Sequence, residues 1–567
     1  MSNISMKRFL FWGIFVFFGP LAILARFYYL NNALIEPHPW RQTQTALTIL
    51  HLFQGTATVW DYRSPLQGML WNNVYEFPLY QWVVCQVMHL GLSLEVASRL
   101  VTLLSFFLSA FFSYLIILQF FNRQIANWFL LIYLVNPFGV IFSRVCLIDF
   151  FALAATLGSV YGLLQLRAGS MRARNWLCFA LGGLIAGLAK INIWFFVTVS
   201  LTGLLMVEVL QQKKRNWGWF VGLVGILLVQ FGVIFLWNYH RFNDLGSPAD
   251  TPWLVGELSQ RFESWRWKKI VWDFAIRSLL YDWLLIPFVI GTWVLFRKSK
   301  LLFLVLFGVF ISHTLVFFQV QTYHDYYLIA SMPYLFFIAA LGLDYLVSQQ
   351  NKIIQALYFI VLALMVYKSF QLRFYYSPIV HDYRTKLKPI YQLKKFTDPT
   401  DIVYWDAKQG RFEIATYAQR NVGLSETERL IGERNKMGEV YSPTVFHFDS
   451  KPNFRLVSES SKVWLDGAPY FIVHRVSEVG SFKFEAEENL AVFSELPKGV
   501  SPVSFKKKVD NCKSKQPLLM FLPQSSEVVI SIEGHSQPFR LPGGRRFLNL
   551  PNHSNWGCRF EIKLEVF

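Results

Sequence analysis

The chain has 567 residues, of which 54% are hydrophobic and 18% aromatic, whereas charged residues make up only 16%. Soluble domains usually contain about 25% charged residues, so this composition excludes an ordinary soluble protein and predicts a multi-pass membrane protein with some soluble mass. The formal net charge of +18 is compatible with nucleic-acid binding, but cytoplasmic loops of membrane proteins collect Lys and Arg. We therefore predict no nucleic-acid partner.

Apolar windows predict about eleven transmembrane helices within residues 1–370, because a helix needs about 20 mostly apolar residues to cross a bilayer. The windows lie near 8–28, 98–120, 125–142, 147–166, 176–190, 192–210, 216–238, 278–296, 301–320, 328–348 and 352–370. The first window follows "MSNISMKR" and has no small-residue cleavage site, which predicts a retained anchor. The two windows between 176 and 210 are the shortest.

The basic loops indicate how the predicted helices are oriented in the membrane. If Lys7 and Arg8 are cytoplasmic, every loop that alternate crossings place in the cytoplasm contains Lys or Arg, as the positive-inside rule requires. The threading leaves three outer segments, 29–97, 143–149 and 321–327. We therefore predict a protein of the plasma (inner) membrane whose functional face is extracytoplasmic.

Two apolar segments are predicted to lie in the membrane interface. If "YEFPLYQWVVCQVMHLGL" (75–92) crossed the bilayer, every later loop would lie on the opposite side of the membrane and the basic clusters would be outside. "RFESWRWKKIVWDFAIR" (261–277) is basic but falls outside, and its tryptophans indicate an amphipathic helix at the headgroup level.

Residues 371–567 differ in character and are predicted to form an extracytoplasmic α+β domain. "RFEIATYAQRN" (411–421) has helical spacing, and from about residue 480 onwards we expect mostly β structure. Short apolar runs that predict strands occur at 400–406, 468–476 and 516–523.

The five cysteines are too few for a disulfide scaffold, and the sequence has no CxxC or Cys/His zinc spacing. We expect Cys85, Cys146 and Cys178 to pack in apolar surroundings. Cys512 and Cys558 lie in the polar tail, where they could pair if that tail is outside the cytoplasm.

Polar side chains gather on the predicted outer face, and ionisable residues near a bilayer usually indicate a function. They occur in "EPHPWRQTQTA" (36–46), "SRVCLIDFF" (143–151), "GLAKINIWFF" (187–196) and "HDYYLIASMP" (324–333). The candidate site residues in these segments are Glu36, His38, Arg41, Gln42, Gln44, Arg144, Asp149, Lys190, His324, Asp325, Tyr326 and Tyr327.

Cations beside carboxylates at an outer membrane surface suit a sugar donor that is carried on a polyprenyl phosphate. Arg41, Arg144 or Lys190 could neutralise the phosphate as it leaves, and a carboxylate or imidazole could take the proton of the acceptor. A pair of carboxylates could instead bind a divalent metal, so Mg or Mn is left open as a cofactor.

Each candidate also has a structural interpretation. Arg144 could pair with Asp149 at the end of a helix, and Lys190 could extend its amine to the interface. His324–Tyr327 fit a solvated helix start next to an aromatic belt.

Taken in order, these segments resemble the GT-C superfamily of membrane glycosyltransferases, specifically the dolichyl-phosphate-mannose protein mannosyltransferases and their bacterial relatives, which include the lipid A aminoarabinose transferases. The resemblance covers roughly residues 30–340. Its landmarks are "HPWRQTQTA" (38–46), "YEFPLYQW" (75–82, with Glu76), "ASRLVTLLSFFLSAFFSYLI" (97–116), "SRVCLIDFFALAATL" (143–157), "GLAKINIWF" (187–195) and "HDYYLIASMP" (324–333).

The resemblance implies a GT-C fold, a lipid-linked sugar donor, a hydrophobic cavity and chemistry on the extracytoplasmic side. Arg41 matches the arginine that follows the family's catalytic acid, and Asp149 matches the acid of the second outer loop. Lys190 matches a lysine of the cavity region, and Tyr327 a tyrosine before the family's apolar segment.

The chain departs from the family at the position of the catalytic acid. Many relatives have Asp, often Asp-Glu, where this chain has His38-Pro39. The candidate general base is therefore His38, whose imidazole titrates near neutrality, or Glu36.

We predict a glycosyltransferase that moves a sugar from a polyprenyl-phosphate donor to an extracytoplasmic acceptor, which is a lipid, glycan or protein. One alternative is a ligase or polymerase that uses a lipid pyrophosphate. Another is a transporter of lipid-linked sugars, which should show paired halves with polar residues at the midplane. Here the polar residues collect at one face.

Overall fold

The structure is a computed structural model. It describes residues 19–62, 74–211, 217–245, 251–349 and 352–375, a few isolated residues, and short segments of the C-terminal part. The chain forms two compact units, Met1–Arg63 with Val74–His381, and Ser64–Asn73 with Asp382–Phe567. All candidate site residues lie in the first unit.

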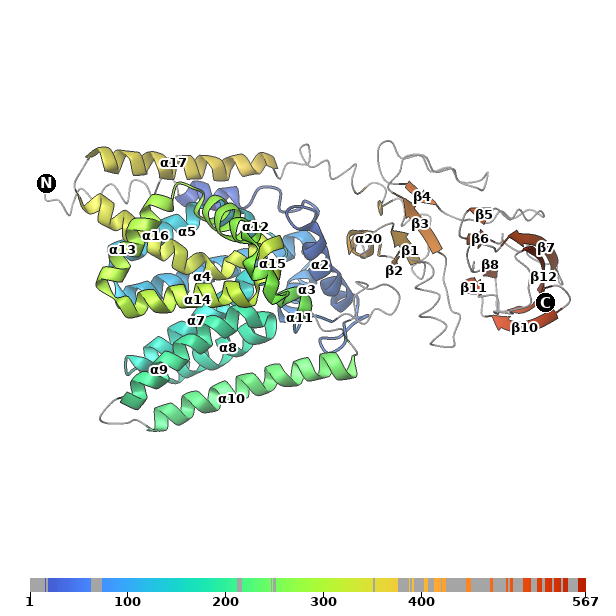
Figure 1. Cartoon of the computed structure of the whole chain (residues 1–567), viewed down its shortest axis with the longest axis horizontal. Coiled ribbons are helices and arrows are strands. Elements are labelled where there is room, and N and C mark those ends of the chain that lie inside the picture. The colour runs from blue at the N-terminus through green and yellow to red at the C-terminus, as the bar shows by residue number, and fades with distance from the viewer. Residues whose placement is uncertain are drawn as a thin grey trace. The chain divides into compact units, whose positions relative to one another are not determined.

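The described part of the first unit is helical (Figure 1). Its first half contains α2 (Pro39–Phe53), α3 (Leu79–His89), α4 (Leu94–Phe120), α5 (Arg123–Val135), α6 (Pro137–Phe142), α7 (Asp149–Arg167), α8 (Ala173–Trp194), η1 (Phe195–Val199), α9 (Ser200–Gln211), α10 (Trp217–Tyr239) and η2 (His240–Asp244). Its second half contains α11 (Thr251–Val255), η3 (Leu258–Phe262), α12 (Ser264–Trp267), η4 (Lys268–Leu280), α13 (Leu285–Lys298), α14 (Lys300–Val316), α15 (Phe318–Tyr323), η5 (Asp325–Ser331), α16 (Met332–Ser348) and α17 (Lys352–Tyr375).

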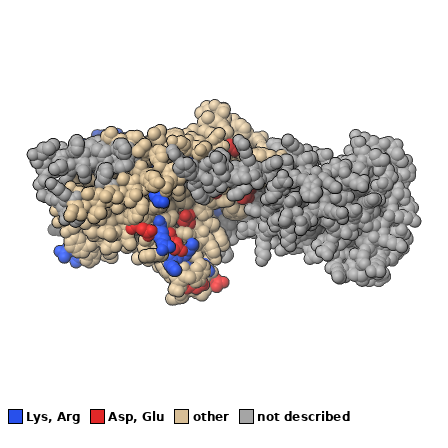
Figure 2. Space-filling model, turned by 90° about the horizontal axis from the view of Figure 1, so that it is seen from above, with Lys and Arg blue, Asp and Glu red and all other residues tan. Residues whose placement is uncertain are grey.

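In the described part of the chain, six helical runs are long and apolar enough to cross a membrane, or seven if the bent pair of η4 and α13 forms one span. They lie where the sequence predicts spans, so the chain is a multi-pass membrane protein. In the view of Figure 2, most of the described surface carries no charged side chain, as expected for helices that face lipid. The total of about eleven crossings stays a prediction.

One predicted span is interrupted. The window 125–142 is divided into α5 and α6, because Pro137 cannot continue the hydrogen bonding of α5. The side chain of Asn136 accepts hydrogen bonds from the backbone N–H groups of Phe138 and Gly139 and so caps α6.

The run from α8 to α9 reverses its direction at Lys190, where the backbone leaves the helical region (φ −159°, ψ 89°). Lys190 pairs with Asp149 at the start of α7, whereas Glu208 of α9 pairs with Arg167 at the end of α7. The chain therefore returns along α7 after residue 190, and α8 and α9 form a hairpin. This reversal brings Lys190 to the same end of the bundle as the first residue of α7.

Glycines allow the close contact between α7 and α8. A Cβ on Gly162 would lie 2.7 Å from the carbonyl oxygen of Asn175, and one on Gly182 would lie 2.8 Å from that of Ala155. Small residues at such contacts let two membrane helices approach closely. The contact holds Asp149 and Lys190 at a fixed separation.

The two segments predicted to lie in the interface are helical. α3 covers the middle of 75–92, and 261–277 falls within η3, α12 and η4. The helix from Ser264 to Leu280 is bent by 103° from α13, and Tyr281 and Asp282 at the bend have left-handed backbones. Such a sharp turn suits a helix that leaves the direction of the spans, and the interfacial position itself stays a prediction.

The described segments of the second unit include three four-stranded sheets. In the first, β1 (Ile402–Trp405) pairs in parallel with β2 (Asn421–Leu424) and β3 (Val445–Asp449), β4 (Tyr470–Ile472) pairs antiparallel with β3, and α20 (Phe412–Ala418) lies between β1 and β2 in sequence. The other two sheets have the orders β10-β9-β12-β7 and β11-β8-β6-β5. Their strands are β5 (Ala486–Glu487), β6 (Leu490–Val492), β7 (Val503–Asp510), β8 (Leu518–Leu522), β9 (Ser526–Ile532), β10 (His535–Leu541), β11 (Gly544–Leu548) and β12 (Arg559–Val566).

Two expectations for the C-terminal part stay predictions, namely the boundary at residue 370 and a single α+β domain. Cys512 and Cys558 lie outside the described residues. In the first unit, Cys85 and Cys146 are buried as expected, and Cys178 is half-buried.

Candidate active site

A buried cluster contains two of the candidates, Glu36 and Arg144. Glu36 Oε1 lies 3.2 Å from Arg99 and 3.6 Å from Arg144, and all three side chains are fully buried. Arg99 also donates to the carbonyl oxygen of Leu30 at 2.7 Å, and Arg144 donates to that of Tyr29 at 3.2 Å. These bonds hold the segment that leads into α2 against α4 and the connection between α6 and α7.

A second group of candidates surrounds Lys190. Its ammonium group pairs with Asp149 and lies 4.4 Å from the ring centre of Tyr327 and 5.1 Å from that of Tyr326. The Asp149 side chain is 1% exposed and the Lys190 side chain 9%. The cation is thus held between a carboxylate and two aromatic faces.

Arg41 forms the second cation–carboxylate pair of this region. Its guanidinium donates to Glu76 Oε1 at 2.9 Å and also to the side chain of Gln44. Burial opposes the charge of Arg41, but Glu76 together with Tyr326, Tyr327 and Asp149 outweighs it, so the pKa of the guanidinium lies above its ordinary value. Arg41 is therefore a permanent cation.

A backbone bond joins the two cation–carboxylate pairs. The N–H of Phe77 donates to the carbonyl oxygen of Leu188 at 3.1 Å, so the residue after Glu76 is tied to the residue two before Lys190. Arg41 interacts electrostatically with Asp149, and Lys190 with Glu76. The two pairs therefore form one charged site.

His38 and Asp325 form a third pair beside this site. His38 Nε2 lies 2.7 Å from Asp325 Oδ1, and each side chain is 23% exposed. The ring of His38 also contacts that of Tyr326 edge to face at 4.8 Å, which connects this pair to the group around Lys190. The pair can pass a proton between an imidazole and a carboxylate.

The backbone of His38 is left-handed (φ 58°, ψ 53°), which is uncommon for a residue other than glycine. Pro39 then starts α2. Strained backbone of this kind costs roughly 1–3 kcal/mol and clusters at functional sites. At His38 this backbone conformation occurs where the imidazole contacts Asp325 of η5.

The ring of His324 lies 5.7 Å from that of His38. Burial, together with the positive charges of neighbouring groups, lowers the pKa of His324 to about 4. His324 is therefore neutral at pH 7.

The two glutamines of "EPHPWRQTQTA" are fully buried. Gln42 accepts from the backbone N–H of Cys146 at 2.9 Å and donates to the carbonyl oxygen of Pro37 at 2.8 Å, so it ties α2 to the connection between α6 and α7. Gln44 orients Arg41.

The structure adds side chains that the sequence did not single out. The hydroxyl of Tyr62 donates to the carbonyl oxygen of Glu76, and Arg241 donates to that of Tyr75 at 3.1 Å. Arg99 closes the cluster around Glu36. An arginine inside a predicted span, as in "ASRLV", was a signal that could have identified Arg99.

Within the residues that the structure describes, no group of three or more His, Cys, Asp or Glu side chains could hold a metal ion. Each carboxylate of the site already faces a lysine, an arginine or a histidine. These residues do not fit a metal by themselves, so a role for Mg or Mn stays a prediction.

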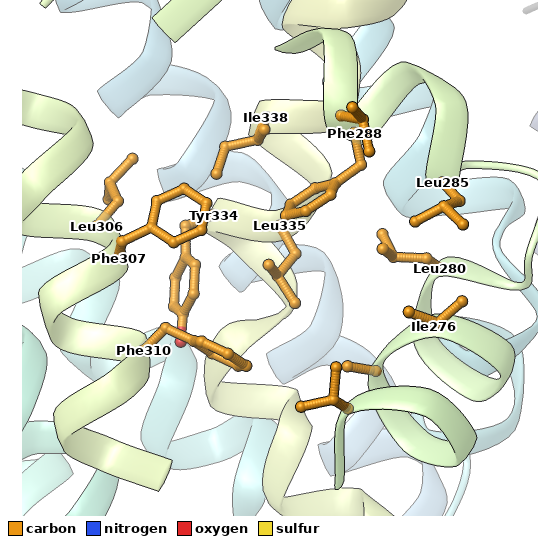
Figure 3. Close-up of a pocket in the computed structure, with 13 residues that line it drawn as sticks. Ile276, Leu280, Leu285, Phe288, Leu306, Phe307, Phe310, Tyr334, Leu335 and Ile338 are labelled. Carbon is orange, nitrogen blue, oxygen red and sulfur yellow. The ribbon is translucent and has the colours of Figure 1, made fainter. Parts of the chain in front are cut away.

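An apolar cavity of about 230 Å³ lies between η4, α13, α14 and α16. Figure 3 shows Tyr334, Leu335 and Ile338 of α16 between side chains of α14 on one side and of η4 and α13 on the other. Its lining is apolar apart from the hydroxyl of Tyr334, which donates to Ser331. Such a cavity suits a hydrocarbon chain.

These features define a helical membrane protein in which the segment before α4 builds a charged site against the ends of later helices. No family model matches the chain, and no curated protein sequence is similar to it. Among solved structures, the chain is similar to apo ArnT, the lipid A aminoarabinose transferase, from Cupriavidus metallidurans, with a TM-score of 0.51 and 15% identity over 77% of this chain and 93% of ArnT. This likeness shows that the chain shares the fold of ArnT, as the resemblance predicted.

Two other solved structures are similar to the chain at lower TM-scores. ArnT from the same organism bound to undecaprenyl phosphate has a TM-score of 0.48 and 15% identity over 77% of this chain and 93% of that one. The archaeal oligosaccharyltransferase AglB from Archaeoglobus fulgidus, in complex with an inhibitory peptide and a dolichol-phosphate, has a TM-score of 0.46 and 10% identity over 73% of this chain and 64% of that one.

Proposed function

We propose that the chain is a glycosyltransferase that moves a sugar from a polyprenyl-phosphate-linked donor to an extracytoplasmic acceptor. The observation that supports this most is the single site formed by Arg41 and Lys190, each held by a carboxylate. The GT-C fold is consistent with this chemistry, and the residues of the site are the basis of the proposal.

In this proposal the two cations bind the donor phosphate. A sugar linked through a phosphodiester carries a single negative charge, whereas a phosphomonoester carries about −1.5 to −2 at neutral pH. Negative charge therefore increases on the phosphate as the bond to the sugar breaks. Arg41 and Lys190 would then stabilise the transition state more than the bound donor, which is what catalysis requires.

The His38–Asp325 pair is proposed to activate the acceptor. If the N–H of His38 Nε2 donates a hydrogen bond to Asp325, then Nδ1 is unprotonated and is the nitrogen that takes the proton of the acceptor. The acceptor atom attacks the anomeric carbon, and the electron pair of the broken C–O bond stays on the phosphate. Direct displacement of this kind inverts the anomeric centre.

Glu36 and Arg144 receive a structural role in the proposal. Both side chains are fully buried, and Glu36 pairs with Arg144 and with Arg99. A buried ion pair of this kind holds its segments in place and is costly to break. His38 therefore remains our candidate base.

The apolar cavity is proposed to accept part of the polyprenyl tail. Tyr334 and Leu335 of its lining lie on α16, which continues directly from η5 with Tyr326 and Tyr327. A tail in the cavity would thus lie along the same stretch of chain as the aromatic faces around Lys190.

Mass spectrometry of surface glycans and glycolipids tests this proposal in cells that express the chain, an Arg41→Gln variant or no protein. We expect a sugar modification that requires the wild-type chain and is lost with Arg41→Gln. Glu208→Gln is the matched control, because Glu208 belongs to an exposed ion pair away from the site. Identical glycan and glycolipid profiles with and without the wild-type chain would refute the proposed function.

A further inference from the structure

An exposed aromatic pair lies beside the site and takes no part in the contacts described above. The rings of Trp253 in α11 and Tyr323 in α15 stack with their centres 5.6 Å apart and an angle of 17° between their planes. Trp253 is 48% exposed and Tyr323 47%. Exposed apolar surface of this kind marks a place where a ligand, a partner or a membrane binds.

The aromatic pair is one side chain away from the proposed base. The ring centre of Trp253 lies 6.2 Å from that of His324, and the ring of His324 lies 5.7 Å from that of His38. His38 in turn contacts Asp325 at 2.7 Å. A molecule that reacts at His38 can therefore extend past His324 onto the exposed rings.

Arg261 and Gly256 hold α11 against its neighbours. The guanidinium of Arg261 donates to the carbonyl oxygen of Val255 at 3.0 Å and to that of Leu315 at 2.9 Å, which ties the end of α11 to the end of α14. Gly256 has a left-handed backbone (φ 69°), and a Cβ on it would lie 2.8 Å from Gln319 Cβ in α15. Because α11 is fixed on α15 (Figure 1), the aromatic surface is preorganised for a ligand.

Polar groups border the aromatic pair on the side of Tyr323. The guanidinium carbon of Arg266 lies 5.9 Å from the ring centre of Tyr323. Arg266 donates to Glu263 Oε2 at 2.9 Å and to Gln319 Oε1 at 2.7 Å, and the Glu263 side chain is 39% exposed. The cation and the carboxylate neutralise each other, so this border offers hydrogen-bonding atoms without net charge.

We infer that Trp253 and Tyr323 bind a sugar ring of the acceptor, so that the acceptor is a glycan or a glycolipid and not a protein without glycans. This inference rests on the proposed function, because it takes the acceptor to react at His38. A sugar ring has a face of C–H groups, which stacks on the negative face of an aromatic ring. Its hydroxyls lie around the rim, where the uncharged border beside Tyr323 can hydrogen-bond them. A lipid headgroup layer, where Trp and Tyr also gather, is the alternative that the test must separate.

The aromatic pair then acts on the acceptor, whereas Arg41 and Lys190 act on the donor phosphate. Loss of the stacking surface should weaken use of the acceptor and leave donor binding unchanged. Trp253 is the residue to change. Phe in its place keeps a flat ring, whereas Leu is similarly apolar in a membrane but has no ring to stack.

Mass spectrometry of surface glycans, glycolipids and proteins tests the inference in cells that express the wild-type chain, Trp253→Phe, Trp253→Leu or no protein. The modified molecule should carry a carbohydrate to which the new sugar is added. Trp253→Phe should keep most of the modification, and Trp253→Leu should slow it about tenfold, as expected for the loss of one stacked ring. Both purified variants should bind a fluorescent undecaprenyl phosphate as the wild-type chain does.

The matched control is Trp217→Leu, at a tryptophan that is 53% exposed at the start of α10. It should change neither the modification nor the binding of undecaprenyl phosphate. If Trp253→Leu does not fold, Tyr323→Leu compared with Tyr323→Phe gives the same test from the other ring.

Three results would overturn the inference and leave the proposed function standing. One is a modification confined to proteins without glycans. Another is equal transfer by Trp253→Phe and Trp253→Leu, at any level, since that indicates a ring that faces lipid or has no role. The third is loss of undecaprenyl phosphate binding in Trp253→Leu at an unchanged melting temperature, which places the ring at the donor. If the wild-type chain modifies no surface molecule, the proposed function fails as well.

Discussion

Removing the charges of the Lys190–Asp149 pair, singly and together, separates their contribution to stability from their contribution to catalysis. Lys190→Gln leaves the Asp149 carboxylate, 1% exposed, without its cation, and Asp149→Asn leaves the ammonium without its anion. Breaking a buried ion pair by removing one partner typically costs about 3–5 kcal/mol. Two aromatic faces remain around the ammonium in Asp149→Asn, so we expect this variant at the lower end of the range.

The double variant Lys190→Gln/Asp149→Asn should recover most of the lost stability, because two amides of similar size can hydrogen-bond each other. We expect it within about 1–2 kcal/mol of the wild-type chain. Transfer should not recover, since loss of one preorganised donor to a developing negative charge costs roughly 10²–10³ in kcat. Thermal unfolding in detergent and sugar transfer measured on the same samples give the two readouts.

Two results of this double-mutant cycle would contradict the reasoning. If the double variant is as unstable as the sum of both single variants, the two side chains do not interact and the ion pair is not a unit. If the double variant transfers sugar at the wild-type rate, Lys190 does not stabilise the leaving phosphate. Arg167→Gln, at an exposed pair on the other end of α7, is the matched control and should change neither readout.

The remaining predictions concern the base, the buried cluster, the helix contact and pH. His38→Gln should lower transfer by about 10²–10⁴ without changing membrane insertion, and activity near wild type would exclude His38 as the base. Glu36→Gln should instead lower the melting temperature, because two buried arginines lose their anion, a loss that typically costs about 3–5 kcal/mol of stability. An unchanged melting temperature would contradict the structural role. Gly162→Val should push α7 away from α8 and destabilise the chain by about 1–3 kcal/mol, measured by thermal unfolding. His324 has a lower pKa in the folded chain than when unfolded, so its contribution to stability is complete above about pH 6.5 and is lost as the pH falls toward 4. His324→Phe should flatten the pH dependence of the melting temperature in that range, and an identical pH profile would refute the assignment.

The sequence by itself determined the class of protein and the positions of most spans. Hydropathy is a local property, and each long apolar run must satisfy its backbone hydrogen bonds within one helix in lipid. The segments that carry His38, Arg41, Asp149, Lys190 and Asp325 could be found for the same reason, since polar residues stand out in apolar surroundings. The roles of these residues as base and phosphate ligands stay predictions.

Only the tertiary structure decided which of these charges are partners. Asp149 pairs with Lys190 across 41 positions of sequence, and His38 pairs with Asp325 across 287. Spacing along the chain carries no information about such pairs, because they depend on how closely the helices pack and on where the hairpin of α8 and α9 turns. The same reason explains why Arg144 pairs with Glu36 although Asp149 is nearer in sequence.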